Sequence, residues 1–220
     1  MRSGKYSPSD SGKIAKRLLD ILGAFAGLLF LSPLFLFVFL GVRLTMGSPV
    51  LFSQLRAGKG GAPFRLFKFR TMRNSRDASG NLLEDEKRIT SFGNFLRAAS
   101  LDEIPQLYNV LRGEMSLVGP RPLLLEYVPL YSRRQRRRLE MLPGITGWAQ
   151  INGRNALSWE EKFEFDVWYV ENWSFMLDCR ILWKTLARVV SPSGISHEGH
   201  ATMEKFQGTP SSENSEERNA

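Results

Sequence analysis

Cysteine and histidine are scarce in this chain of 220 residues. Cys179 is the single cysteine, which excludes an internal disulfide and every metal site built from several cysteines, and it suits a reducing, cytosol-facing location. The two histidines, His197 and His200, form an H-x-x-H pair in a polar tail and lack the glutamate of the H-E-x-x-H zinc motif. The sequence therefore predicts neither a disulfide scaffold nor a zinc enzyme.

Acidic residues are also in deficit, since 22 Asp and Glu stand against 30 Lys and Arg and give a formal net charge of +8. This charge favours a polyanionic partner, which could be nucleic acid, an anionic membrane or a phosphorylated substrate. The hydrophobic content of 43% is sufficient for a packed core, so a disordered chain is excluded and one or two small domains are expected.

Charge is missing altogether from Ile21 to Val42, ILGAFAGLLFLSPLFLFVFLGV. A straight helix of this length would cross the core of a bilayer, and a simple transmembrane helix is one interpretation. The stretch has no small-residue cleavage site, which disfavours a signal peptide. Ser32 and Pro33 lie at its midpoint, where proline removes a helical hydrogen bond and a serine hydroxyl can bond the freed carbonyl.

Basic residues flank this stretch on both sides, and the positive-inside rule therefore places both of its ends in the cytoplasm. A straight span cannot satisfy both flanks, so we expect a re-entrant helix-break-helix membrane hairpin over residues 13–46. The flanking residues are Lys13, Lys16, Arg17, Arg43, Arg56, Lys59, Arg65, Lys68 and Arg70.

The body of the chain combines strand and helix patterns. PVLFSQ and FRLFKF flank LRAGKGGAP and predict a β-hairpin between Pro49 and Phe69. RDASGNLLEDEKR reads as a loop, and ITSFGNFLRAAS has apolar residues at helical spacing. PGITGWAQINGRN predicts a glycine-rich loop and a strand that ends at an Asn152–Gly153 turn, and an aromatic amphipathic helix follows it.

The expected fold class is α+β and mainly helical, with short β-hairpins and amphipathic interfacial helices beside the membrane hairpin. We divide the chain into a flexible N-terminus (1–12), the membrane hairpin (13–46), a compact cytosolic catalytic domain (47–207) and a disordered tail (208–220), because the tail is polar throughout.

SLDEIPQL places two carboxylates, Asp102 and Glu103, side by side in a basic chain. One interpretation is a capping box between Ser100 and Glu103. Pro105 opposes it, because proline suits the first helical position better than the second turn. The alternative is a helix from Pro105 to Gly113, with both carboxylates in the turn before its N-terminus, where the macrodipole keeps a carboxylate ionised.

Arginines follow the carboxylates at two places. Arg121 lies between Pro120 and Pro122, which restrict the backbone, and its planar donor fork suits phosphate. YSRRQRRRLEML could bind nucleic acid, bind anionic headgroups or form a solvated face. It has no aromatic platform and no nucleic-acid motif, so headgroup contact is the simplest interpretation. Its arginines are Arg133, Arg134, Arg136, Arg137 and Arg138.

Three segments closely resemble motifs of the bacterial sugar transferases that are monotopic phosphoglycosyl transferases. They are KFRTM (68–72), SLDEIPQLYNVLRGEMSLVGPRPLL (100–124) and PGITGWAQINGRN (143–155). The resemblance extends roughly from Lys13 to Phe206 and is to the small members that lack extra N-terminal transmembrane helices. The tail from Gly194 to Gly208 resembles that of the transferases that load N,N'-diacetylbacillosamine phosphate onto undecaprenyl phosphate for protein glycosylation.

The resemblance implies a two-step exchange at the cytoplasmic face of the bacterial inner membrane, the first membrane step in making a glycoprotein, O-antigen or exopolysaccharide. Asp102 would attack the sugar-bearing phosphate of a UDP-sugar, UMP would leave, and the sugar phosphate would pass to undecaprenyl phosphate. Glu103 would be its partner, either in metal coordination or in handling the acceptor phosphate.

Mg²⁺ held by Asp102 and Glu103 would neutralise the diphosphate. The phosphate-binding residues would be Lys68, Arg70, Arg97, Arg121 and Arg154. Asp178 also matches a family position, and its alternative role is that of a structural salt-bridge acid. The expected partners are the donor, the acceptor and the membrane, and nucleic acid is not among them. The rival hypothesis is a noncatalytic membrane module whose arginines bind anionic lipid.

Overall fold

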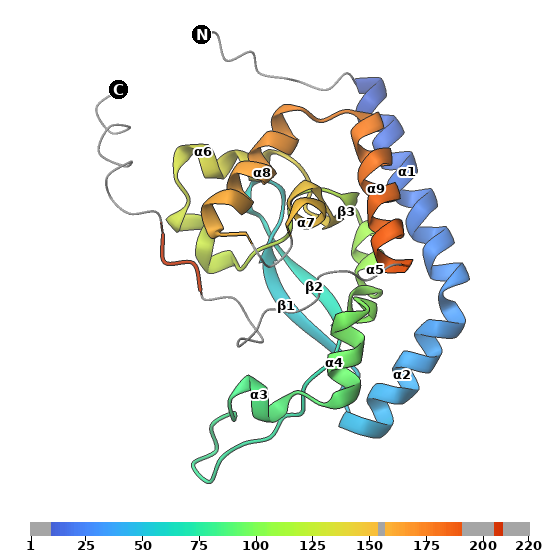
Figure 1. Cartoon of the computed structure of the whole chain (residues 1–220), viewed down its shortest axis with the longest axis vertical. Coiled ribbons are helices and arrows are strands. Elements are labelled where there is room, and N and C mark those ends of the chain that lie inside the picture. Colours follow the sequence, from blue (N-terminus) through green and yellow to red (C-terminus); the bar gives the residue numbers. More distant parts are fainter. Residues whose placement is uncertain (1–9, 154–156, 191–204, 209–220) are drawn as a thin grey trace.

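The structure is a computed structural model that describes residues 10–153, 157–190 and 205–208. The first two helices, α1 (Asp10–Phe30) and α2 (Ser32–Met46), form a bent arm along one side of the molecule (Figure 1). They meet at an angle of 63°. No single helix in the described ranges has the length and apolarity to cross a membrane, and this bent pair meets those two criteria only when its helices are taken together.

The break between the two helices follows from Pro33. Proline has no N–H to donate to the carbonyl of Leu29, four residues earlier. The Ser32 hydroxyl donates to that carbonyl instead, at 2.8 Å. The amide of Phe35 bonds the carbonyl of Leu31 at 2.7 Å, so the backbone stays paired through the bend. The predicted helix-break-helix at Ser32 and Pro33 is confirmed as a structure, and its re-entry into a membrane remains a prediction.

Glycines bring the arm close to the body. A Cβ on Gly23 of α1 would lie 2.6 Å from Cδ1 of Leu117, and a Cβ on Gly41 of α2 would lie 2.4 Å from the ring of Phe92. Both distances are shorter than any real contact, so these two positions require glycine unless their neighbours move. The outward face of both helices exposes large apolar side chains: Ile14, Leu18, Leu22, Phe25, Leu29, Phe30, Leu36, Phe37, Leu40 and Leu44.

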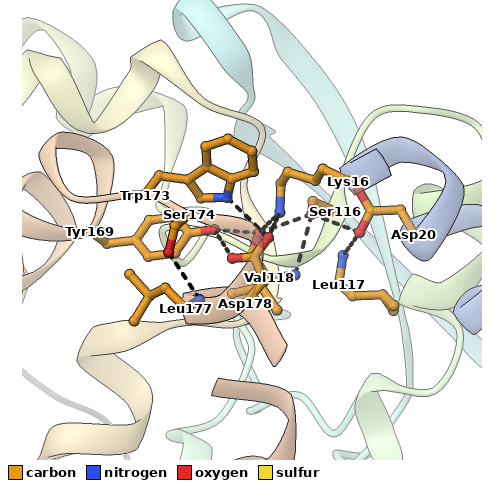
Figure 2. A network of polar contacts seen from close by, with 10 residues as sticks. All are labelled: Lys16, Asp20, Ser116, Leu117, Val118, Tyr169, Trp173, Ser174, Leu177 and Asp178. Atoms are coloured by element: carbon orange, nitrogen blue, oxygen red, sulfur yellow. Dashed lines mark hydrogen bonds and ion pairs between the residues drawn. The ribbon is translucent and has the colours of Figure 1, made fainter. Parts of the chain in front are cut away.

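A buried polar network attaches α1 to the body (Figure 2). Lys16 Nζ lies 2.6 Å from Oδ2 of Asp178, and it also donates to the carbonyl of Val118 at 2.9 Å. Asp178 is fully buried and accepts from Tyr169 Oη at 2.6 Å and from Trp173 Nε1 at 3.0 Å. These contacts are those of a structural salt-bridge acid, which was the alternative role for Asp178.

The predicted β-hairpin is confirmed. Strands β1 (Leu51–Ala57) and β2 (Pro63–Phe69) pair antiparallel, with Leu51 opposite Phe69 and Ala57 opposite Pro63. The first strand continues three residues into the expected loop, and a 3-10 turn, η1 (Lys59–Gly61), closes the hairpin. A second sheet pairs β3 (Ser116–Val118) with β4 (Gly144–Thr146) in parallel, so it is not the further hairpin that we expected.

Helices make up most of the remainder, which confirms the mainly helical α+β class. The α-helices are α3 (Asp85–Arg88), α4 (Ser91–Ala98), α5 (Gln106–Leu111), α6 (Arg133–Arg136), α7 (Trp148–Asn152), α8 (Trp159–Glu171) and α9 (Phe175–Val190), and the 3-10 turns are η2 (Leu101–Glu103), η3 (Leu125–Leu130) and η4 (Arg137–Glu140).

Two local predictions were wrong. The strand expected before Asn152 is helix α7. Ala149 and Ile151 are buried at a spacing of two, which also fits a strand, and a segment this short does not distinguish the two periods. Part of the expected loop RDASGNLLEDEKR is helix α3. The helix expected after the Asn152–Gly153 turn is confirmed as α8. Of the N-terminus predicted to be flexible (1–12), residues 10–12 belong to helix α1. Residues 1–9, most of the tail predicted to be disordered (209–220) and both histidines lie outside the described ranges.

Candidate active site

The carboxylate pair lies in η2, a 3-10 helix of one turn between α4 and α5. Ser100 precedes it in the left-handed conformation, with φ of 56°, and its side chain makes no capping bond. The capping-box interpretation is therefore wrong. Pro105 is the N-cap of α5, and Gly113 follows the helix with φ of 79°, so the predicted helix is present within one or two residues of its expected ends.

Glu103 is held by two cations from distant parts of the chain. Lys68 of β2 donates to Oε1 at 2.7 Å, and Arg121 donates to the same oxygen at 2.8 Å. Burial alone would raise the pKa of Glu103, but the charges and hydrogen bonds of Arg121 and Lys68 outweigh it and lower the pKa to about 2. Glu103 is thus ionised at neutral pH and anchors both cations.

Asp102 is in a different environment from its neighbour. It is 8% exposed, and Lys68 Nζ lies 3.6 Å from its Oδ2, beyond the distance of a strong hydrogen bond. Burial raises the pKa of Asp102, and the anion of Glu103 raises it further, whereas Lys68, Arg121 and Arg97 oppose the shift. The site therefore combines one carboxylate bonded to two cations with one that is less firmly held.

Two of the other predicted phosphate ligands, Arg97 and Arg70, have different partners. Arg97 Nε donates to Thr71 Oγ1 at 3.0 Å, and its charge reaches Asp102. Arg70 is buried away from the pair, where it donates to the carbonyls of Met46, of Gly47 at 2.8 Å and of Ser48 at 3.1 Å. These carbonyls at the end of α2 lack helical partners, which explains why they recruit a guanidinium. Arg154 lies outside the described residues.

The arginine cluster of residues 133–138 pairs largely with acidic residues of α8. Arg134 lies 2.6 Å from Glu164, Arg137 pairs with Glu171, and Arg138 lies 2.7 Å from Asp166. Our expectation that this cluster serves anionic headgroups does not hold for these three residues, because the pattern of arginines did not reveal the acids that face them. Arg133 and Arg136 are exposed.

Arg138 connects this interface to the site. It is 3% exposed, and its Nη2 donates at 2.6 Å to the backbone carbonyl of Arg121, while Nη1 donates to Tyr131 Oη at 3.2 Å. Arg138 therefore fixes the backbone that presents Arg121 to Glu103. The sequence shows this residue only as one of five arginines, so its positioning role was missed.

Asn109 is a second residue that sequence reasoning missed. It is fully buried in α5, accepts from the amide of Phe67 at 3.1 Å and donates to the carbonyl of Arg65 at 2.7 Å. Its side chain thus takes the place of a neighbouring strand along β2 and fixes the segment that carries Lys68. An asparagine in the interior of a short helix was the available signal.

The donor set fits Mg²⁺ only in part. Among the described residues no group of three or more His, Cys, Asp or Glu side chains could hold a metal ion. Glu103 Oε1 is already occupied by two cations, which leaves Asp102 as the better candidate ligand. Mg²⁺ is often bound by one or two carboxylates that share it with substrate phosphates, and this site fits that arrangement.

Residues 11–192 of the chain match the sequence model of the family described as bacterial sugar transferase. The chain belongs to the bacterial sugar transferase family. The membership predicted from the motifs is thereby confirmed, and with it the prediction that the protein is a phosphoglycosyl transferase enzyme.

Three relatives illustrate the range of the family. The uncharacterized sugar transferase EpsL of Bacillus subtilis is 57% identical over 196 residues, which are 89% of this chain and 97% of EpsL. The UDP-glucose:undecaprenyl-phosphate glucose-1-phosphate transferase of Xanthomonas campestris is 40% identical over 86% of this chain and 42% of the relative. The undecaprenyl-phosphate galactose phosphotransferase of Salmonella typhimurium is 36% identical over 84% and 42%. The chain thus spans almost all of EpsL and about two fifths of the other two.

Proposed function

We propose that this enzyme transfers a sugar 1-phosphate from a UDP-sugar to undecaprenyl phosphate and releases UMP. The observation that supports it best is the asymmetry of the carboxylate pair. Glu103 holds Lys68 and Arg121 through one carboxylate oxygen, whereas Asp102, beside it and less firmly held, remains available as a nucleophile. The names of the relatives from Xanthomonas and Salmonella agree with this reaction.

In the first half-reaction, an oxygen of the Asp102 carboxylate attacks the phosphorus that bears the sugar. A new O–P bond forms, the P–O bond to the other phosphate breaks, and UMP leaves with that electron pair. Lys68 and Arg121 lie where negative charge develops on the transferred group, and Glu103 keeps both of them ionised and fixed. Arg97 adds a further positive charge near Asp102.

In the second half-reaction, an oxygen of undecaprenyl phosphate attacks the same phosphorus and the bond to Asp102 breaks. The carboxylate is regenerated, and the product is the lipid diphosphate sugar. When Mg²⁺ is bound it neutralises diphosphate charge, and Asp102, with Glu103 beside it, would hold it on the protein side. A lipid acceptor and a soluble donor can thus use one site in turn.

The bent arm supplies access to the lipid acceptor. We place α1 and α2 in the cytoplasmic leaflet of the bacterial inner membrane as a monotopic re-entrant element. Their exposed apolar side chains and the 63° bend support this placement. The arm is fixed to the body by the buried Lys16–Asp178 pair, which would hold the active site at the membrane surface.

For the sugar, we propose UDP-N,N'-diacetylbacillosamine or another UDP-N-acetyl amino sugar, on the basis of the resemblance of the tail. A screen of UDP-sugars for UMP release, with undecaprenyl phosphate as acceptor, tests this choice. UMP release only from UDP-glucose or UDP-galactose would contradict the proposed N-acetyl amino sugar and leave the proposed reaction class intact.

The covalent step is tested by a reaction with donor alone. We expect UMP in an amount stoichiometric with enzyme before acceptor is added, and a gain in intact-protein mass equal to one sugar phosphate. Asp102→Asn should abolish both signals while the protein still floats with liposomes. If UMP appears only after acceptor is added and no adduct forms, undecaprenyl phosphate attacks the UDP-sugar directly. If Asp102→Asn turns over normally, Asp102 has no catalytic role.

A further inference from the structure

Arg56 shares one face of the β-hairpin with Lys68. In the register of the two strands, Arg56 lies opposite Phe64 and Phe52 lies opposite Lys68. Side chains alternate between faces along a strand, and residues opposite each other share a face. Arg56 therefore projects to the same side of the hairpin as Lys68, the residue that contacts both carboxylates.

The segment that carries Arg121 runs beside this end of β1. The amide of Ala57 donates to the carbonyl of Leu123 at 3.1 Å, and Arg56 forms an antiparallel bridge with Leu124. Arg56 is accordingly within electrostatic range of both Arg121 and Glu103. Burial lowers the pKa of the Arg56 guanidinium, the charge of Arg121 lowers it further, and Glu103 opposes both effects.

The guanidinium of Arg56 is incompletely satisfied. Its Nη2 donates to Gln54 Oε1 at 2.7 Å, whereas its Nε is buried and has no hydrogen-bond partner within the described part of the chain. No ion pair joins Arg56 to a described carboxylate, while Arg121 is paired with Glu103. A partly buried cation beside a second cation is unfavourable unless an anion joins them.

We propose that Arg56 binds the diphosphate of the UDP-sugar together with Lys68 and Arg121. The nature of the anion rests on the proposed function, whereas the position of the cation does not. An arginine has five donors in a planar fork, so the guanidinium can reorient toward a phosphate oxygen and satisfy the donors that its present surroundings leave unused. Binding would also relieve the repulsion between Arg56 and Arg121.

Equilibrium binding of UDP and of uridine to the full-length protein in detergent tests the proposal. We expect Arg56→Gln to weaken UDP binding by about ten- to a hundredfold, the range for one charged hydrogen bond, and to leave uridine binding unchanged. The matched control is Arg65→Gln. Arg65 is exposed in the same hairpin and lies opposite Leu55, so it occupies the other face. This control should change UDP binding by less than about twofold.

Three outcomes would overturn the proposal: Arg56→Gln binds UDP like the unaltered protein, Arg65→Gln weakens binding equally, or uridine binding falls in parallel. If thermal unfolding shows that Arg56→Gln is misfolded, Arg56→Lys takes its place. It keeps the charge and loses the fork, and UDP binding equal to that of the unaltered protein would then refute a direct fork contact.

The same measurements separate this proposal from the proposed function. UDP binding that depends on Arg56, without UMP release from any UDP-sugar, would contradict the transferase reaction and support the anion site. Normal turnover, with KM for the donor unchanged in Arg56→Gln, would contradict the anion site alone.

Discussion

Arg121 and Glu103, 18 positions apart in the sequence, are joined by a hydrogen bond of 2.8 Å between Nη2 and Oε1. With Lys68, this contact lowers the pKa of Glu103 to about 2 against the opposing effect of burial. The ordinary value is 4.5, so the ionised carboxylate stabilises the fold fully above pH 4.5, and this contribution is lost as the pH falls from 4.5 through 2.

Arg121→Gln should therefore raise the pKa of Glu103 toward 4.5 and make the loss of stability between pH 4.5 and 2 shallower. It should also reduce UMP release by about a hundredfold, the usual cost of removing one donor from a developing anion. Urea unfolding across this pH range measures the first effect. Arg112→Gln, at the surface pair with Glu114, is the control, and an identical acid profile for Arg121→Gln and the unaltered protein would contradict the pKa assignment.

Arg138→Met should reveal whether the arginine cluster is structural. It leaves the Asp166 carboxylate buried without its cation, which should lower the free energy of unfolding by about 3–5 kcal/mol. Arg134→Met removes an exposed pair with Glu164 and should cost at most about 1 kcal/mol. Equal losses in unfolding, or lost liposome binding with intact stability, would favour the original headgroup interpretation.

Lys16→Met should uncouple the arm from the body. Asp178 would keep its bonds to Tyr169 and Trp173 but lose its cation, and we expect a loss of about 3–5 kcal/mol in the free energy of unfolding. Tryptophan fluorescence during unfolding in detergent reports it, because Trp173 donates to Asp178 directly. Lys59→Met, the same change at an exposed site, is the control. A small loss that matched the control would show that the network contributes little.

Phe206 anchors the end of the described chain. It is 4% exposed and packs against Tyr127, Tyr131 and Phe163, with its ring centroid 5.0 Å from that of Phe163. Phe206→Ala should cost about 3 kcal/mol, the lower limit for a buried phenylalanine. Leu130→Ala, at a position 40% exposed, should cost much less. Similar melting temperatures of the two variants would mean that the segment detaches without consequence for the domain.

Pro33→Ala should straighten the arm, because it restores an amide that can bond the carbonyl of Leu29. In the unaltered arm, external maleimide should label neither terminus of intact cells, which is tested with cysteines at Ser3 or Ser211 in a Cys179→Ser background. In the straightened variant one terminus should become accessible. Labelling of a single terminus before any change would establish a spanning helix.

Local chemistry was the part of the structure that the sequence predicted best. Pro33, the glycines of the hairpin turn and Pro105 each impose a backbone constraint that acts without distant partners, and the elements they delimit were found close to their expected ends. The carboxylate pair was likewise recognisable from adjacent residues.

Partners distant in sequence were the part that could not be predicted. Arg70 and Arg138 are basic residues in basic segments, and only the fold reveals that the first bonds carbonyls at the end of α2 and the second pairs with Asp166. Alternation along a strand could have placed Arg56 beside Lys68, but only once the hairpin register was known. Charge type is encoded locally, whereas the group that each charge meets depends on tertiary contacts.

The position of the network on α1 has a consequence for tolerated changes in this helix. Lys16 and Asp20 attach its N-terminal half to β3 and α9, with Asp20 accepting from Ser116 and from the amide of Leu117, and Pro33 sets the bend beyond its C-terminal end. One residue inserted between Asp20 and Pro33 would rotate the bend by about 100° and advance it by about 1.5 Å. The arm would then leave the body in a different direction, so the length of α1 acts as a ruler: point substitutions on its outer face should be tolerated, and single-residue insertions or deletions should not.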